Sequence, residues 1–223
     1  MNSNIKIFLC AVIGLSILFS GCEKEPGTVT DIDWNVYNTV TIGTQVWLKE
    51  NLRTTKLNDG TEIPNVTSGT EWAGLSTPGY CYYDNSWSNA LTYGALYNWH
   101  TVNTGKLCPT GWHVPSNEEW ITLTNFLGGD TLVGGKLKAT GTAFWESPNR
   151  GATNETGFSA RAGGSRSASG PFLDNVKECA HFWSSTAYSI ESAIFFGIYN
   201  ITSNYLKTYC SKEFGESVRC VRD

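Results

Sequence analysis

The residues best suited to metal binding are spread along the chain without a telling spacing. The three histidines are His100, His113 and His181. A metal site needs ligands that converge and that are held by further polar partners, and no two of these histidines stand at a separation typical of such a site. We therefore predict structural histidines and no metal.

Motifs for catalysis are missing as well. The glutamates that could form an acid–base pair are Glu118, Glu119, Glu146 and Glu155. Two of them open a predicted helix, where the helix dipole favours carboxylates in any case. No serine stands in a G-x-S-x-G context, and no phosphate-binding loop or dinucleotide fingerprint occurs. The sequence thus predicts no catalytic residue and no cofactor, and the protein is not expected to be an enzyme.

The remaining functional signal is aromatic. Aromatic residues make up 13% of the chain and include nine tryptophans, and flat rings at a surface can stack on sugars. Five rings fall in or near predicted loops: Trp72, Trp87, Trp145, Tyr188 and Tyr205. The alternative is that most of them anchor the core. A pocket also needs a few directed polar groups, so the proposed ligand-binding residues are Trp145, Asn149, Arg150 and Arg166.

The first 21 residues read as a cleaved export signal. One cation, Lys6, precedes an apolar run over residues 7–19 that is short for a membrane span. The following LFSGC resembles the lipobox of bacterial lipoproteins, so Cys22 is the predicted lipidation site; an ordinary secretory signal is the alternative. Residues 22–33 are expected to form a short tether. Their acidic start resembles surface-export signals of Bacteroidota lipoproteins, which predicts an outer-membrane lipoprotein at the cell surface, or else one facing the periplasm.

The cysteines left after removal of the signal and use of Cys22 are five: Cys81, Cys108, Cys179, Cys210 and Cys220. An odd number allows at most two disulfides and leaves one thiol over. None of the spacings is C-x-x-C, which excludes the usual zinc and thioredoxin-like signatures. The pairing itself is not fixed by these spacings.

Composition limits the class of partner. Charged residues are only 16% of the 223, and the net charge is −4. There is no basic patch for a phosphate backbone, so nucleic acid is excluded as a partner. Twenty-three glycines beside many aromatics suit a loop-rich fold that contains β-structure. Residues 34–223 are expected to form a single domain.

The clearest structural signal is residues 107–120, LCPTGWHVPSNEEW. Its prolines keep the chain out of a helix until Ser116, which forms a capping box with Glu119. Apolar residues at helical spacing then run to Gly128-Gly129, which ends the helix. A second helix is predicted over residues 90–102, capped by Asn89. Strands are expected over 36–47, around a turn at Gly43-Thr44, and over 80–83, 181–185, 193–200, 205–210 and 217–222.

Five blocks together resemble a known family. They are VTIGTQVWLKENLRTTKLNDG at 40–60, ALYNW at 95–99, residues 108–120, FWSS at 182–185 and SVRCVRD at 217–223. This order is similar to the Fibrobacter succinogenes major paralogous domain, common in lipoproteins of Bacteroidota and Fibrobacterota. Trp34 departs from the pattern, because it stands where a turn glycine is common in that family.

That family resembles, more distantly, the formylglycine-generating-enzyme and C-type-lectin-like folds. The resemblance implies an α+β fold: two helices packed on a small twisted antiparallel sheet, with long loop insertions over about residues 131–177. It also implies a Cys108–Cys220 bridge, with Cys179–Cys210 next and Cys81 free. The activity of the generating enzyme does not carry over, because Cys210 and Cys220 do not match its close pair of reactive cysteines. Asp130-Thr131-Leu132 resembles an acceptor motif for O-glycosylation in Bacteroidales, which makes Thr131 a candidate.

The functional hypothesis is a membrane-anchored, non-catalytic module that binds a carbohydrate or a surface protein through the 131–177 loops and exposed aromatics. Two alternatives stay open. One is an enzyme with thiol or metal chemistry near Cys210 and Cys220. The other is a structural subunit of a surface assembly.

Overall fold

The computed structural model describes residues 27–129, 131–173 and 175–223. The predicted signal peptide, residues 1–21, and the predicted lipidation site, Cys22, lie outside the described residues. The described part is a mixed α and β structure made mostly of antiparallel strands, with a few short helices. This confirms the α+β class.

The larger sheet has five strands in the order β1-β2-β3-β12-β6. Their bounds are β1 Thr28–Thr30, β2 Val36–Ile42, β3 Gln45–Leu48, β6 Trp112–His113 and β12 Val221–Arg222. The predicted hairpin is confirmed: Ile42 pairs with Gln45 across Gly43, whose φ of 60° suits a glycine turn. The last strand, β12, lies between β3 and β6, so the end of the chain is built into the sheet.

The predicted tether is too long at its C-terminal end. Thr28 pairs with Asn38 and Thr30 with Val36, so β1 already belongs to the sheet. Asp31 is buried and accepts a hydrogen bond from the Tyr37 hydroxyl at 2.7 Å. The domain therefore begins ahead of residue 34, and residues 28–33 are not a linker.

The second sheet has three antiparallel strands in the order β11-β10-β9, and each overlaps a strand predicted from the sequence. They are β9 Cys179–Ala187, β10 Ser192–Tyr199 and β11 Tyr205–Ser211. Two small two-stranded sheets complete the strands: β4 Tyr80–Cys81 with β5 Leu96–Tyr97, and β7 Ser165–Arg166 with β8 Phe172–Leu173. A 3₁₀ turn, η1 Tyr83–Asn85, follows β4.

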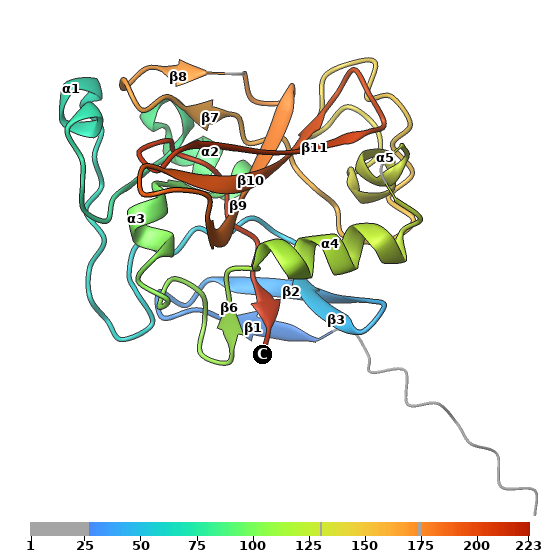
Figure 1. Ribbon diagram of the computed structural model, residues 1–223, viewed down its shortest axis with the longest axis horizontal. Coiled ribbons are helices and arrows are strands. Elements are labelled where there is room, and N and C mark those ends of the chain that lie inside the picture. Colours follow the sequence, from blue (N-terminus) through green and yellow to red (C-terminus); the bar gives the residue numbers. More distant parts are fainter. Residues whose placement is uncertain (1–26, 130, 174) are drawn as a thin grey trace, which may run out of the picture.

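Helix α4, Asn117–Phe126, starts at the predicted capping box. The Ser116 side chain accepts from the Glu119 amide at 3.2 Å, and the Glu119 carboxylate accepts from the Ser116 amide at 2.8 Å. The helix lies between the two sheets (Figure 1). Its Trp120 contacts Trp47 of β3 and Phe196 of β10, with ring centroids 4.8 and 4.9 Å apart. One helix thus joins both sheets into one core.

The predicted helix over 90–102 is wrong as a single helix. It is broken into α2 Trp87–Tyr93, the strand β5 and α3 Trp99–Val102. The break falls at Gly94, where φ is 82° and an added Cβ would stand 2.7 Å from the Leu52 carbonyl oxygen. The Ala95 amide donates to that same oxygen at 2.9 Å, so contact with a distant segment overrides the helical pattern. Two further short helices are α1 Gly69–Ala73 and α5 Val133–Leu137.

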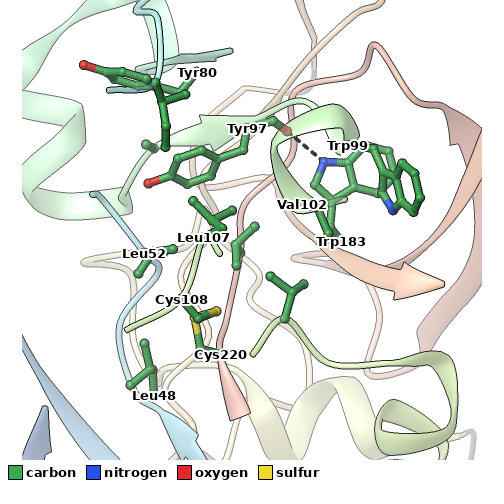
Figure 2. Close-up of a cluster of buried hydrophobic side chains, with 14 of the residues drawn as sticks. Leu48, Leu52, Tyr80, Tyr97, Trp99, Val102, Leu107, Cys108, Trp183 and Cys220 are labelled. Atoms are coloured by element: carbon green, nitrogen blue, oxygen red, sulfur yellow. Dashed lines mark hydrogen bonds between the residues drawn. A yellow bond between two sulfur atoms is a disulfide. The ribbon is translucent and has the colours of Figure 1, made fainter. Parts of the chain in front are cut away.

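The predicted bridge between Cys108 and Cys220 is present. It joins the segment ahead of α4 to the segment ahead of β12 inside a large apolar cluster (Figure 2). In the same cluster the Trp183 indole donates to the Tyr97 carbonyl at 2.7 Å. Because the bridge spans 112 residues of sequence, it ties the two halves of the chain together.

The second predicted bridge, Cys179–Cys210, is wrong. Cys179 pairs with Tyr199 at one end of β10, whereas Cys210 pairs with Ala193 at the other. At the rise of a β-strand these positions are about 20 Å apart, and bridged Cα atoms must lie within about 7 Å. Their separation along the sheet rules out a bond between them.

Residues 131–177 do form a long excursion, but much of it is packed. Trp145, Phe158 and Ala160 are buried in the core cluster that also contains Trp120. The excursion contains α5, β7 and β8. It is therefore a structural part of the domain rather than a free set of binding loops.

Candidate functional site

Two of the predicted ligand-binding residues serve the fold instead. Trp145 is fully buried, and its indole N–H donates to the Ala160 carbonyl at 2.8 Å. Asn149 is buried and its amide nitrogen donates to the carbonyls of Ala139 and Gly141 at 3.0 and 2.8 Å. Neither side chain can meet a ligand at the surface.

Arg166 is a third correction. Its guanidinium is buried and donates to three carbonyls, those of Gly170, Val66 and Thr67. It also lies over the Trp72 ring, 4.6 Å from the centroid. The arginine ties the 66–72 segment to β7, which is a structural role.

Two predicted positions keep an accessible side chain. Arg150 and Thr131 are exposed, so their proposed roles in ligand binding and glycosylation stay predictions. Of the loop aromatics, Trp72 and Trp145 are buried, Tyr205 is half-buried, and Trp87 and Tyr188 are exposed. The accessible rings therefore lie outside the 131–177 region.

The most unusual surface residue is Trp34. It is 85% exposed and has a φ of 64°, in the left-handed region that bulky residues rarely enter. The turn over residues 31–35, here called the Trp34 turn, is built by Asp31. One carboxylate oxygen of Asp31 accepts from the amides of Asp33 and Asn35, both at 2.9 Å. The buried aspartate thus fixes the turn while the indole points into solvent.

A second aspartate fastens the turn to its neighbour. The Asp33 carboxylate accepts from the Thr55 amide at 2.6 Å and from the Thr55 hydroxyl at 2.8 Å, and Lys56 lies 3.7 Å away. Burial acts to raise the pKa of Asp33, but these hydrogen bonds outweigh it and hold the pKa below its usual value. The carboxylate is therefore ionised at neutral pH, and the Trp34 turn is clamped to residues 54–56.

Thr55 also lines a surface hollow of about 350 Å³, which we call the aromatic hollow. Its other lining residues are Glu62, Ile63, Pro64, Asn65 and Tyr80. The hollow forms because the turn at Asn58-Asp59-Gly60 folds residue 62 back onto residue 56, and Asn65 then bridges to Tyr80. Glu62 and Asn65 are exposed, so a carboxylate and an amide stand at its rim.

A ladder of rings connects this hollow to the core. Tyr97 is 6.2 Å from Tyr80, Tyr80 is 5.4 Å from Tyr82, and Tyr82 is 5.4 Å from Trp87. Figure 2 shows Tyr80 at the edge of the core cluster, with its hydroxyl pointing away from the disulfide. Burial and the nearby charge of Asp33 raise the pKa of Tyr80, so it stays a neutral donor. The ladder ends at Trp87, which is 57% exposed.

The cysteines do not form the pair of reactive thiols that the enzyme alternative requires. The disulfide removes Cys220 from any pair of reactive thiols with Cys210, which contradicts that form of the enzyme alternative. Burial raises the pKa of the Cys81 thiol to about 11 and that of Cys210 further. Among the residues that the structure describes, no three acidic, histidine or cysteine side chains gather as ligands of one metal ion.

Trp34 and Tyr80 belong to the candidate site but are not among the ligand contacts predicted from the sequence. For Trp34 the signal is that it stands where the family resemblance leads one to expect a turn glycine. For Tyr80 there was none, since its place at the hollow depends on the contact between residues 65 and 80.

The family described as Fibrobacter succinogenes major domain matches residues 40–222 of the chain. No curated protein and no solved structure gives a significant match. In the described part of the chain, no helix has the length and apolar character to cross a membrane.

Proposed function

The chain belongs to the Fibrobacter succinogenes major domain family, and on that premise we propose that it is a cell-envelope lipoprotein that binds carbohydrate without catalysing a reaction. The binding site is the aromatic hollow together with the Trp34 turn. Its body is a C-type-lectin-like domain, anchored by acylation of Cys22 and displayed at the cell surface. The proposal is supported by the site geometry and by the export-type leader.

Trp34 is the observation that carries the proposal. An L-residue in the left-handed region costs about 1–2 kcal/mol, and a large exposed ring adds unfavourable contact with water. Strain of this kind is retained where it serves a function. A glycine would satisfy the turn, so the indole is kept for what it contacts outside the protein.

Carbohydrate fits the chemistry around Trp34. Sugar rings present apolar C–H faces that stack on aromatic planes, and hydroxyls that need paired donors and acceptors. The hollow offers the carboxylate of Glu62 and the amide of Asn65. The Thr55 hydroxyl, which donates to Asp33, can still accept a hydrogen bond. Trp34 and Trp87 supply exposed rings. Trp34 follows Asp33, which binds Thr55 of the hollow, and Trp87 packs on Tyr82 of the ring ladder.

The proposed lectin-like fold is supported by the disulfide and by the place of the last strand. A disulfide joins the segment ahead of the capped helix to the segment ahead of the last strand, and that strand lies within the main sheet. This is the Cys108–Cys220 bridge that the resemblance implies. The site lies away from the disulfide, on loops that a rigid body positions, as binding sites often do.

A glycan array with purified mature protein tests the proposal. Wild type is compared with Trp34→Gly and with Tyr188→Ala, a matched control because Tyr188 is also exposed but stacks on Tyr209 in another sheet. We expect at least one glycan whose affinity falls tenfold or more in Trp34→Gly and is unchanged in Tyr188→Ala. Equal binding by all three proteins would overturn the site. Absence of glycan binding, with a stoichiometric protein co-purifying through Trp34, would replace carbohydrate by a protein partner.

A further inference from the structure

A second exposed apolar region lies at the other end of the main sheet. Phe126, at the end of α4, is 64% exposed. We call this residue, with Gly43 and Thr44 at the tip of the β2–β3 hairpin, the Phe126 face. Figure 1 shows the end of α4 and the β2–β3 hairpin on one side of the molecule and α1 and α3 on the other.

The Phe126 ring packs on the tip of the β2–β3 hairpin. It lies directly on Gly43, where an added Cβ would be 3.0 Å from the ring. Hollows of about 340 and 400 Å³ lie beside it, and both are lined by Gly43 and Phe126. The ring is therefore held against the hairpin, with its exposed side next to open space.

The face carries almost no net charge. Among the residues that line the two hollows, the charged ones are Lys136 and Glu155, which pair at 3.2 Å. The rest of the lining is apolar, glycine, or neutral threonine and glutamine. An acidic protein, with net charge −4, meets anionic headgroups with least repulsion through such a neutral face.

The start of the described chain lies near this face. The Gly27 amide donates to the Thr39 hydroxyl at 3.0 Å, four residues before Gly43. Thr41 lines both the hollow that contains Gly27 and the one that contains Phe126. Cys22 is five residues ahead of Gly27 and can reach at most about 18 Å from it. A bilayer that holds acyl chains on Cys22 is thus close to the Phe126 face.

We propose that the Phe126 face rests on the lipid bilayer, with Phe126 inserted at the headgroup boundary. This inference rests on the proposed acylation of Cys22. A lipid anchor and an apolar contact then act together, as stable attachment requires. Because the Trp34 turn joins β1 to β2 at the end opposite Gly27, the contact directs the ligand site away from the membrane.

Site-directed spin labelling of the acylated mature protein tests the contact. A label at Thr44→Cys reports on the face while Phe126 is kept, and a label at Ile190→Cys, on an exposed hairpin of the other sheet, is the matched control. The protein is placed in vesicles of phosphatidylethanolamine and phosphatidylglycerol, and collisions with oxygen and with a water-soluble nickel chelate are compared. Protein without an introduced cysteine is treated with the same label, which shows how much the native thiols take up.

We expect the ratio of oxygen to nickel collisions at position 44 to rise several-fold in vesicles and to stay constant at position 190. Adding Phe126→Ser should return position 44 to the aqueous value. If the label at position 44 still collides with the nickel chelate while mass spectrometry shows that Cys22 is acylated, the contact is wrong but the anchor stands. Unmodified Cys22 overturns the anchor, and the contact with it. Concentration-dependent shielding at 44 in detergent, without lipid, would assign the face to a second copy.

Discussion

Replacing Trp34 by glycine should leave the stability almost unchanged, which is unusual for loss of a tryptophan. Because 85% of the residue is exposed, the lost contact area is under about 50 Å², worth about 1 kcal/mol. Relief of the left-handed strain returns about 1–2 kcal/mol. The greater freedom of glycine in the unfolded chain costs about 0.4–1 kcal/mol. The sum predicts a free energy of unfolding within about 1 kcal/mol of wild type.

Urea denaturation followed by circular dichroism, with the disulfide kept oxidised, measures this. Trp34→Ala is the diagnostic partner, because alanine loses the same contacts but keeps the strain; it should be less stable than Trp34→Gly by about 1 kcal/mol. Trp120→Ala is the buried control and should lose about 3–5 kcal/mol. If Trp34→Gly loses as much as Trp120→Ala, or if Trp34→Ala is the more stable of the pair, the indole supports the fold and the argument for a functional residue fails.

Three further predictions concern the body that carries the site. The Cys108–Cys220 bond closes a loop between cysteines 112 residues apart. Its reduction should lower the free energy of unfolding by about 4–5 kcal/mol, seen as a lower unfolding temperature in dithiothreitol; an unchanged temperature would contradict this. Ser116→Ala removes half of the capping box and should cost about 1 kcal/mol in urea, whereas a cost near zero would mean that α4 is fixed by packing alone. Burial acts to lower the pKa of His113, but its hydrogen bonds to the carboxylates on either side, including Asp223 at 2.6 Å, raise it. Protonated His113 should therefore contribute its full stabilisation of the fold below the unfolded pKa of about 6.5, and this contribution should be lost as pH rises through the higher folded pKa. The free energy of unfolding of His113→Gln should lack this pH dependence.

Local signals predicted the parts of the fold that depend on neighbouring residues. The capping box at Ser116 and the glycine turn at Gly43 need contacts only a few residues apart, and both are present. The helix over 90–102 failed for the opposite reason, because Gly94 must pass close to Leu52. The Cys108–Cys220 pairing came from the family resemblance rather than from the spacing of cysteines.

The ligand site was harder to predict because burial is a property of the whole fold. Trp145, Asn149 and Arg166 have the composition of a polar-aromatic pocket, yet each finds carbonyl partners inside the domain. Sequence cannot distinguish a ring that stacks on a sugar from one that fills a core. For Trp34 the distinction comes from a backbone angle together with exposure, which only coordinates provide.

Whether a ligand binds at the Trp34 turn and the aromatic hollow can be measured by NMR of the nine tryptophan indole N–H groups. Each resonance is assigned by substitution, and a glycan selected on the array is titrated in. We expect the signals of Trp34 and Trp87 to shift, and those of the buried Trp47, Trp120 and Trp145 to stay in place. Shifts confined to other tryptophans, with Trp34 unmoved at saturation, would contradict this expectation.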